Sequence, residues 1–220
     1  MPLPGMILLS KIGYPVEATL TDHAYNPADQ TSYSFASQSF GVAADNRHVV
    51  VCVGGLAGAG ARSVSSMTIG GVAATKVVEI ALNAVACAIY IANVPTGTTG
   101  TVSVTFNAPM VRAAIAVYRV VFIGSAVAHD TATNVGDPAS VNIDVPAGGV
   151  GIGFSINANI TSVIWSGLTE DIDVDPAENF TYTSAHGEFG AEQVSRAVSV
   201  DSVSAGVSNH LVVASWGRNG

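Results

Sequence analysis

Charged side chains are scarce in this sequence. Asp, Glu, Lys and Arg together make up 11% of the 220 residues, against roughly 25% in an average soluble domain. The 8 basic residues are outnumbered by 16 acidic ones, and the net charge is −8. Because no Lys/Arg cluster is present to neutralise phosphates, nucleic acid is not an expected partner. A surface with so little charge is explained either by cover from other subunits, which predicts a homo-oligomer, or by an exterior rich in Ser, Thr and Asn.

Export signals and long apolar runs are lacking as well. The first 15 residues carry no basic stretch, and their apolar run "MILL" is too short for the core of a signal peptide. No apolar run has the length of a membrane span without charged or turn residues in it. The sequence therefore predicts a chain that is made in the cytoplasm, is not exported by this route and does not bind a membrane.

Cysteine occurs only twice. Cys52 and Cys87 lie in the apolar segments "VVVCVGG" and "AVACAIY". Buried free thiols are the favoured interpretation, because small apolar segments take up Cys as a hydrophobic residue. A disulfide would require the two strands to be neighbours, and this alternative stays open.

Helix signals are few, whereas alternation with period two is frequent. In "SVNIDVP", Val141, Ile143 and Val145 point to one face of a strand, with Asn142 and Asp144 on the other. The segments "VGIGFSIN" and "TVSVTF" alternate in the same way and predict half-buried strands. More continuous apolar segments predict central strands covered on both faces: "HVVVCVGG", "AAIAVYRVVFIG" and "HLVVASWG".

Turn residues separate these segments at intervals of roughly ten residues, which is typical of sandwiches and barrels. The sequence predicts an all-β fold: one antiparallel β-sandwich, jelly-roll-like, with residues 189–197 as the most helix-like segment. Residues 64–69 and 72–80 are expected to form a hairpin around the Gly70-Gly71 turn. The segment 74–92 is expected to form two strands that break at Leu82-Asn83.

The first 35 residues differ from the rest. Their alternation is weak and "YNPADQ" interrupts them, so residues 1–35 are interpreted as an N-terminal arm or edge hairpin and residues 36–220 as the sandwich domain. The arm carries apolar side chains that would bury area against a partner, which makes it the predicted attachment segment. These candidate partner-binding residues are Met6, Ile7, Leu8, Leu9 and Ile12.

Catalytic motifs fail when they are tested one by one. "GFSIN" lacks the second glycine of a nucleophile elbow, so Ser155 is interpreted as a surface serine of a strand. The histidines at 23, 48, 129, 186 and 210 show no zinc-binding spacing. His129 and Asp130 are adjacent, which points their side chains to opposite faces of a strand. No catalytic residue, cofactor or metal site is predicted, and the chain is not expected to be an enzyme.

The densest charge lies in "TEDIDVDPAE" at 169–178. In a regular strand Asp171, Asp173 and Asp175 would share one face, which favours an acidic, edge-protecting surface. A calcium site is the alternative, although Tyr182 stands where an EF-hand needs its glutamate. This segment is also the one place that could supply paired carboxylates to a depolymerase. Trp165 is the best candidate for an exposed sugar-binding aromatic.

Four segments carry a resemblance to a known family. They follow in the order "RHVVVCVGG", "SSMTIGGVAATKVVE", "AIYIANVPTGTTGTVSVTF" and "RAAIAVYRV", and "PAGGVGIGF" and "WSGLTEDID" also fit. Over about residues 36–217 the chain resembles a family of β-rich structural proteins in the virions of tailed bacteriophages. The matched positions are core and turn positions, with no catalytic residue among them.

The resemblance implies a non-enzymatic virion protein that is assembled in the host cytoplasm and has other capsid or tail proteins as partners. A capsid decoration or cement protein is the first expectation. The alternative is a tail, baseplate or fibre component that binds a carbohydrate receptor. Phage β-sandwiches are often trimers, so a trimer is the oligomer that the resemblance favours.

Overall fold

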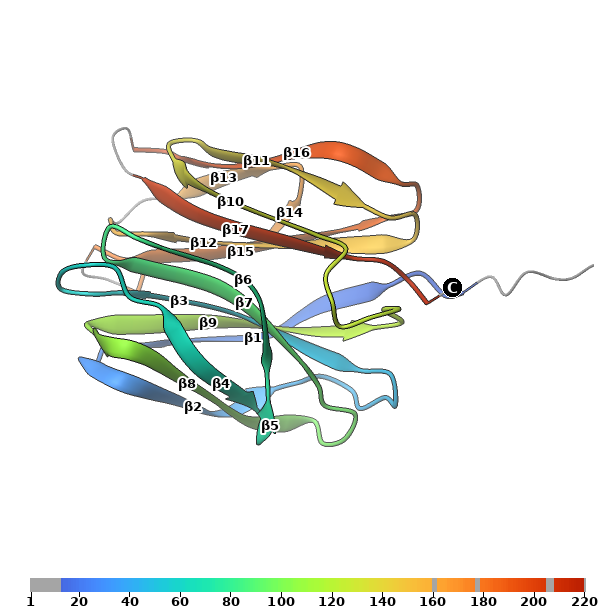
Figure 1. The fold of residues 1–220 in the computed structure, drawn as a ribbon, viewed down its shortest axis with the longest axis horizontal. Helices are drawn as coiled ribbons and strands as arrows, with labels where there is room; N and C mark the ends of the chain where they lie inside the picture. The colour runs from blue at the N-terminus through green and yellow to red at the C-terminus, as the bar shows by residue number, and fades with distance from the viewer. Residues whose placement is uncertain (1–12, 160–161, 177–178, 205–207, 220) are drawn as a thin grey trace, which may run out of the picture.

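The computed structural model describes residues 13–159, 162–176, 179–204 and 208–219. Every named element is a β-strand, and every pairing between these strands is antiparallel (Figure 1). The prediction of an all-β, antiparallel sandwich fold is confirmed. In the part of the chain that the structure describes, no helix is long and apolar enough to cross a membrane.

The strands fall into two consecutive groups. The first group holds β1 (Glu17–Asn26), β2 (Gln30–Ser39), β3 (His48–Leu56), β4 (Val64–Ile69), β5 (Val72–Ala73), β6 (Thr75–Leu82), β7 (Val85–Asn93), β8 (Thr99–Met110) and β9 (Arg112–Val121). They build an inner sheet of order β1-β9-β3-β7-β6 and an outer sheet of order β2-β8-β4-β5.

The second group holds β10 (Asp130–Gly136), β11 (Ala139–Val145), β12 (Gly149–Asn157), β13 (Val163–Ser166), β14 (Thr169–Val174), β15 (Thr181–Phe189), β16 (Gln193–Ser202) and β17 (Asn209–Trp216). Its inner sheet has the order β10-β17-β12-β15-β14, and its outer sheet has the order β11-β16-β13.

The two groups have the same topology. With the short β5 taken as a continuation of β4, each group reads 1-8-3-6-5 in its inner sheet and 2-7-4 in its outer sheet. This is a jelly roll whose fifth strand has moved to the inner sheet. The fold is therefore two tandem jelly rolls of one topology, where a single sandwich was predicted. In this correspondence β1 matches β10, β3 matches β12, β6 matches β14, β7 matches β15 and β9 matches β17.

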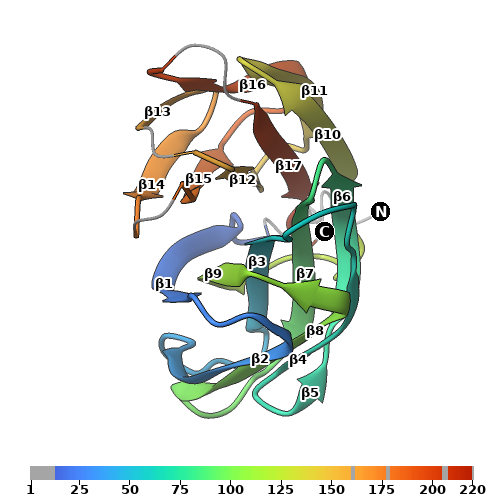
Figure 2. The ribbon, with the colours of Figure 1, turned by 90° about the vertical axis from the view of Figure 1, so that its left-hand side faces the viewer.

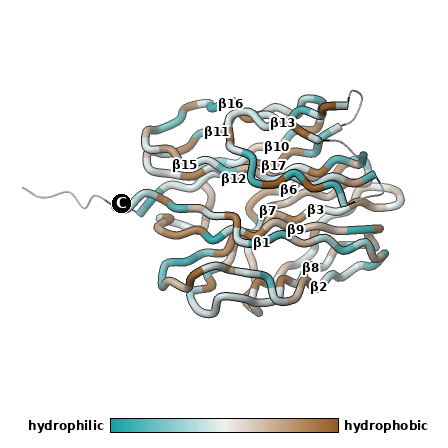
Figure 3. The backbone as a smooth tube through the Cα atoms, turned by 180° about the vertical axis from the view of Figure 1, so that it is seen from behind, coloured by the Kyte–Doolittle hydropathy of each residue, from teal (hydrophilic) through white to brown (hydrophobic). Residues whose placement is uncertain are grey.

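The four sheets stack as layers, with the two inner sheets packed against each other (Figure 2). One apolar core fills each jelly roll, and a third core lies between the inner sheets. We call this third core the seam. Hydrophobic residues run along the strands of the two middle layers (Figure 3). The seam makes the two jelly rolls one packed body, because its core draws buried residues from both.

Cover on both faces changes the environment of β12. Its alternation predicted a half-buried strand, yet every residue of β12 is buried. Ile152 and Phe154 face the seam, while Gly153 lies under the ring of Trp165. Ser155, predicted to be a surface serine, is 0% exposed. The correction follows from the second sandwich, whose outer sheet covers the small residues of this strand.

Other local predictions fare unevenly. In β11, Ile143 and Val145 are buried and Asn142 is exposed, as predicted. The Gly70-Gly71 turn is confirmed, with φ values of 59° and 82°, but the returning strand is split. β5 pairs with β4 for two residues, and the chain then crosses to the inner sheet as β6. The break after Leu82 is confirmed.

The segment 189–197 is not helical. It forms the end of β15, a turn and the start of β16. Ser195 has a φ of 51° where the pairing of β16 with β11 shifts register. Its ends pair as parts of β15 and β16 with neighbouring strands, and this tertiary pairing overrides the helix-like composition.

The described part of residues 1–35 belongs to the first jelly roll. β1 is an edge strand of the inner sheet and pairs with β9, and β2 is an edge strand of the outer sheet and pairs with β8. β2 runs across the predicted boundary at residue 35, so no arm ends there. The candidate attachment residues Met6, Ile7, Leu8, Leu9 and Ile12 lie outside the described residues.

The two cysteines lie in the seam. Cys52 on β3 and Cys87 on β7 are buried and free. Their strands are neighbours, so the geometric condition for a disulfide is partly met, but the interpretation as free thiols is confirmed. Burial raises the pKa of both thiols, with the larger cause in each case being the loss of solvent. Neither thiol is therefore activated as a nucleophile.

Candidate functional site

The acidic segment 169–178 places one carboxylate, that of Asp171, at the edge of the seam. β14 is the edge strand of the second inner sheet, and its pairing with β15 shifts register between Glu170 and Ile172. Asp171 is the extra residue of this β-bulge. Its carboxylate bonds to the first jelly roll, whereas Asp173 bonds to β13 of the second. The bulge therefore separates the aspartates that strict alternation placed on one face.

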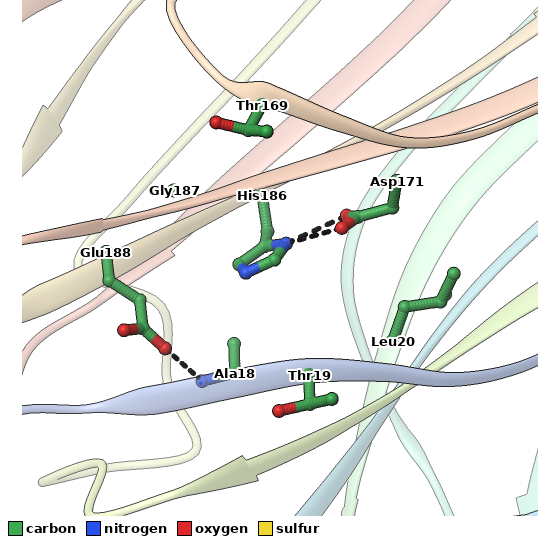
Figure 4. Close-up of a pocket in the computed structure, with 8 residues that line it drawn as sticks. All are labelled: Ala18, Thr19, Leu20, Thr169, Asp171, His186, Gly187 and Glu188. Carbon is green, nitrogen blue, oxygen red and sulfur yellow. Dashed lines mark hydrogen bonds and ion pairs between the residues drawn. The ribbon is translucent and has the colours of Figure 1, made fainter.

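Asp171 is the centre of a cluster of four polar side chains. His186 Nδ1 lies 2.8 Å from Asp171 Oδ1 and 2.9 Å from Oδ2 (Figure 4). Tyr118 Oη lies 2.7 Å from Asp171 Oδ2 and 2.7 Å from Ser184 Oγ. Tyr118 belongs to β9 of the first jelly roll, and the other three residues belong to β14 and β15 of the second. We call these four residues the seam cluster.

The protonation states follow from the surroundings. The hydrogen bond that His186 donates to Asp171 raises the pKa of His186; partial burial opposes the shift, and the charges of Asp171 and Glu188 add to it. Burial is the largest cause that raises the pKa of Tyr118 well above its usual value, and nearby charges come after it. The phenol thus stays protonated and donates to the Asp171 carboxylate, and the Ser184 hydroxyl donates to the phenol oxygen. His186 donates through Nδ1, which leaves Nε2 free for the solvent side.

His186 opens onto a groove along the edge of the seam. The groove has a volume of about 640 Å³. It is lined by Ala18, Thr19, Leu20, Thr169, Asp171, His186, Gly187 and Glu188. Glu188 Oε1 accepts a hydrogen bond of 2.8 Å from the backbone nitrogen of Ala18, so it also joins the two jelly rolls.

An Asp–His pair with an open Nε2 is the arrangement of a general base. A nucleophile would have to lie beside Nε2, and the groove offers the hydroxyls of Thr19 and Thr169 for this role. Figure 4 shows both hydroxyls pointing away from the imidazole. The groove therefore presents a base without a positioned nucleophile among its lining residues.

The metal alternative gains no support. Among the described residues, no group of three or more His, Cys, Asp or Glu side chains is arranged to hold a metal ion. Glu178, at the end of the acidic segment, lies outside the described residues.

The sequence pattern does not predict the seam cluster, because nothing in it links Asp171 to His186. They are 15 residues apart, and a search of local spacing finds no motif. The signal that could have revealed them is the hairpin of β14 and β15, which places Thr169 directly opposite His186. The bulge that turns Asp171 inward leaves no mark in the residue pattern.

Other candidates from the sequence are structural. Trp165 is 8% exposed, and its Nε1 donates to Thr183 Oγ1 over 2.7 Å, so its ring is no exposed sugar platform. Asp130, the neighbour of His129, accepts from the backbone nitrogens of Thr131 and Asp144 instead of forming a dyad.

Carboxylates also close the edges of each sandwich. In the first jelly roll, Asp22 Oδ2 accepts from the backbone nitrogen of Ser39 over 2.8 Å, and Glu79 Oε1 accepts from that of Val64 over 2.6 Å. Each bond joins an inner sheet to the outer sheet of the same jelly roll.

The second jelly roll repeats the arrangement at the corresponding edges. Asp130 Oδ2 accepts from the backbone nitrogen of Asp144 over 2.8 Å, and Asp173 Oδ2 accepts from that of Val163 over 3.1 Å. We call Asp22, Glu79, Asp130 and Asp173 the edge staples. They use acidic residues to satisfy backbone amides that an open sandwich would leave free.

Comparisons of the chain with protein-family models, with curated proteins and with solved structures find no match.

A first prediction concerns pH. Because the pKa of His186 is raised above its unfolded value of 6.5, its contribution to stability is fully present below that value and is lost as pH rises through the folded pKa. The difference in unfolding free energy between the wild-type protein and His186→Asn should therefore be larger at about pH 6 than at about pH 8. Urea titrations at both pH values measure it, and a difference that grows with pH would contradict the assignment.

A second prediction concerns the edge staples. Glu79→Gln weakens a charge-assisted bond to the Val64 amide and should lower the unfolding free energy by about 1 kcal/mol. In the ion pair of Glu79 with Lys76 the Lys76 side chain is 40% exposed, so solvent screens the pair and it adds little. Exposed Glu192 provides the control, since Glu192→Gln should change stability by no more than a few tenths of a kcal/mol. Equal losses in the two variants, measured by urea unfolding, would show that the staple has no effect.

Proposed function

We propose that this chain is a non-enzymatic structural protein of a bacteriophage particle, placed on the particle surface as a capsid decoration or cement protein. The observation that carries the proposal is the use of the acidic side chains. The edge staples and Glu188 bond backbone amides of other strands, and Asp171 joins the two jelly rolls. These carboxylates hold strands and jelly rolls together, which is the role expected of acidic side chains in a structural protein.

Two further observations support the proposal. Jelly rolls are common in viral capsid proteins, although they also occur in lectins and enzymes, so this is an analogy at the level of the fold. The resemblance of residues 36–217 to phage structural proteins points in the same direction. Its segments cover strands in both jelly rolls.

Partners follow from the same proposal. We expect a homo-oligomer, with a trimer favoured, that docks on capsid or tail proteins in the virion. The edge strands β2 and β11 of the outer sheets are places where a neighbouring subunit can cover free backbone groups. Met6, Ile7, Leu8, Leu9 and Ile12 are the proposed attachment residues.

A tail, baseplate or fibre component that binds a carbohydrate receptor is the second candidate. The observation that favours it is the open groove, because Asp171, His186 and Glu188 can hydrogen-bond to sugar hydroxyls. Buried Trp165 no longer contributes to it. Binding on a glycan array that is lost in Glu188→Gln would support this candidate over a purely structural role.

The test is quantitative mass spectrometry of particles purified from a host strain that encodes the chain. The proposal predicts many copies of the chain per particle. When the particles are separated on a density gradient, the ratio of the chain to the major capsid protein should be the same in every particle fraction. A chain that stays in the soluble fraction while the particles are complete would contradict the proposal.

A further inference from the structure

The two jelly rolls meet through corresponding surfaces. β3 lies against β12, which is its own counterpart. β7 lies against β17, and the corresponding strands β15 and β9 are joined by the bond between Ser184 and Tyr118, although the backbones approach more closely on the β7 and β17 side. The packing therefore has the character of a two-fold, isologous interface within one chain. In such an interface each face is complementary to its counterpart. Each inner sheet can therefore also pack against a copy of itself from a second chain.

This equivalence creates a risk of wrong pairing. Both inner faces are apolar, and burial of apolar area does not by itself discriminate between partners. The first inner sheet of one chain could pack on the first inner sheet of another if the connection 122–129 extended. Such pairing of like with like differs from domain swapping, in which the first jelly roll of one chain would pair with the second of another and keep the native seam.

The strand pairings allow the two edges of the seam to be compared residue by residue. Asp171 is the extra residue of the β14 bulge, and Val77 is the extra residue of the corresponding bulge in β6. Thr169 is paired with His186, and Thr75 is paired with Ile91. Asp171 therefore corresponds to Val77, and His186 corresponds to Ile91.

The other two members of the seam cluster have counterparts too. Ile172 pairs with Ser184 as Val78 pairs with Ile89, so Ser184 corresponds to Ile89. His186 and Ala214 both pair with Ile152, just as Ile91 and Tyr118 both pair with Val50. Tyr118 thus corresponds to Ala214. One edge of the seam holds the polar cluster Tyr118, Asp171, Ser184 and His186, and the equivalent edge holds Ala214, Val77, Ile89 and Ile91, all in the seam core.

This asymmetry distinguishes the correct pairing from the two wrong ones. The phenol of Tyr118 comes from the first jelly roll and its acceptor Asp171 from the second. If two first inner sheets paired, Tyr118 would face the apolar positions Val77, Ile89 and Ile91. If two second inner sheets paired, Asp171 would face Ala214. In the first case the buried Tyr118 phenol would lose its acceptor, and in the second the partly buried Asp171 would keep His186 but lose the phenol, so both wrong pairings are penalised.

We propose that the seam cluster is a pairing-specificity device that makes a first jelly roll dock on a second jelly roll and disfavours the pairing of like jelly rolls from two copies of this chain. A single buried polar contact fixes register in coiled coils by the same physics. The proposal does not depend on the assignment to a virion. It explains why Asp171 lies beside a seam whose core is apolar.

The test makes the two edges of the seam alike. The variant Tyr118→Ala, Asp171→Val, Ser184→Ile, His186→Ile carries the residues of the equivalent edge. Wild type and variant are unfolded in urea and refolded over a hundredfold range of protein concentration, and their masses are measured by light scattering. Wild type should return to its starting mass distribution. The variant should form added species of twice the starting mass or more, in a fraction that rises with concentration.

Two single variants keep the test decisive if the fourfold variant does not fold. Tyr118→Phe preserves ring packing and removes the bond to Asp171, so the ratio of like-with-like to correct pairing should rise about tenfold, the effect of one lost hydrogen bond. Tyr33→Phe is the matched control. Tyr33 is also buried, and its phenol donates to the Met110 carbonyl inside the first jelly roll, away from the seam. It should refold like wild type.

The outcomes separate the proposal from simple destabilisation. Species of twice the starting mass or more with Tyr118→Phe, and few or none with Tyr33→Phe, support it. Equal amounts of these larger species with Tyr118→Phe and Tyr33→Phe overturn it. Their absence from Tyr118→Phe, and from the fourfold variant if it folds, also overturns it.

Discussion

Replacing Arg47 with Met is expected to lower the free energy of unfolding by about 3–5 kcal/mol, the loss that follows when buried polar partners are left uncompensated. The Arg47 side chain is 0% exposed. Its guanidinium has five N–H donors, and each one reaches a backbone carbonyl. The acceptors are Val94 at 2.7 Å, Phe40 at 3.2 Å, Gly41 at 2.9 Å, Thr96 at 2.8 Å and Gly97 at 2.8 Å.

These bonds fasten the chain after β2 to the loop between β7 and β8. Met fills much of the same volume but donates nothing, so five carbonyls lose their partner, those of Val94 and Phe40 in a buried place and the other three in a partly buried one. Arg119 is the matched control, because its Nε donates to the Val42 carbonyl at the surface. Arg119→Met should cost less than about 1 kcal/mol. Urea unfolding of both variants makes the comparison, and similar losses would refute the role assigned to Arg47.

The second large effect is expected at Gly54, where the inner sheets approach each other. A Cβ built on Gly54 would overlap Ile156 Cγ1, and it would lie 2.6 Å from Ile156 Cδ1 and 3.1 Å from the Ala86 carbonyl oxygen. Gly54→Ala must therefore push β3 and β12 apart or distort Ile156. We expect a loss of about 1–3 kcal/mol in unfolding free energy.

A double-mutant cycle tests the cause. Ile156→Ala removes the two atoms that the new Cβ would meet, so the loss from Gly54→Ala should shrink to a fraction of its value in that background. Gly190→Ala is the control, because nothing lies within 4 Å of a Cβ at that position. If the loss at Gly54 is unchanged in the Ile156→Ala background, close packing of the seam is not its origin.

Much of the local structure could be predicted from the residues. Alternation identified the inward face of β11, and the Gly70-Gly71 pair and the Leu82-Asn83 break identified two turns. These features depend on neighbours in sequence, and that is why single-sequence patterns reveal them.

The division into two jelly rolls could not be read in the same way. Continuous apolar strands signal cover on both faces, but they do not say what provides the cover. Gly153 and Ser155 looked like the solvent face of β12 because small residues suit either water or a large neighbour. For Gly153 the neighbour is Trp165, which comes from another strand.

The candidate site escaped prediction for a related reason. Asp171 meets Tyr118 across the seam, 53 residues away in sequence. The contact depends on one β-bulge and on the packing of two sheets, and neither has a sequence signature. His129 and Asp130, adjacent in the chain, were the easier pair to notice, yet Asp130 is an edge staple.

Cryo-electron microscopy of the particles that contain this chain tests the central claim most directly. The account predicts density for two stacked jelly rolls, four sheets deep, at symmetry-related positions on the particle surface. The position of that density on the head or on the tail would choose between the decoration protein and the tail component. Complete particles that lack such density at every surface position would contradict the account.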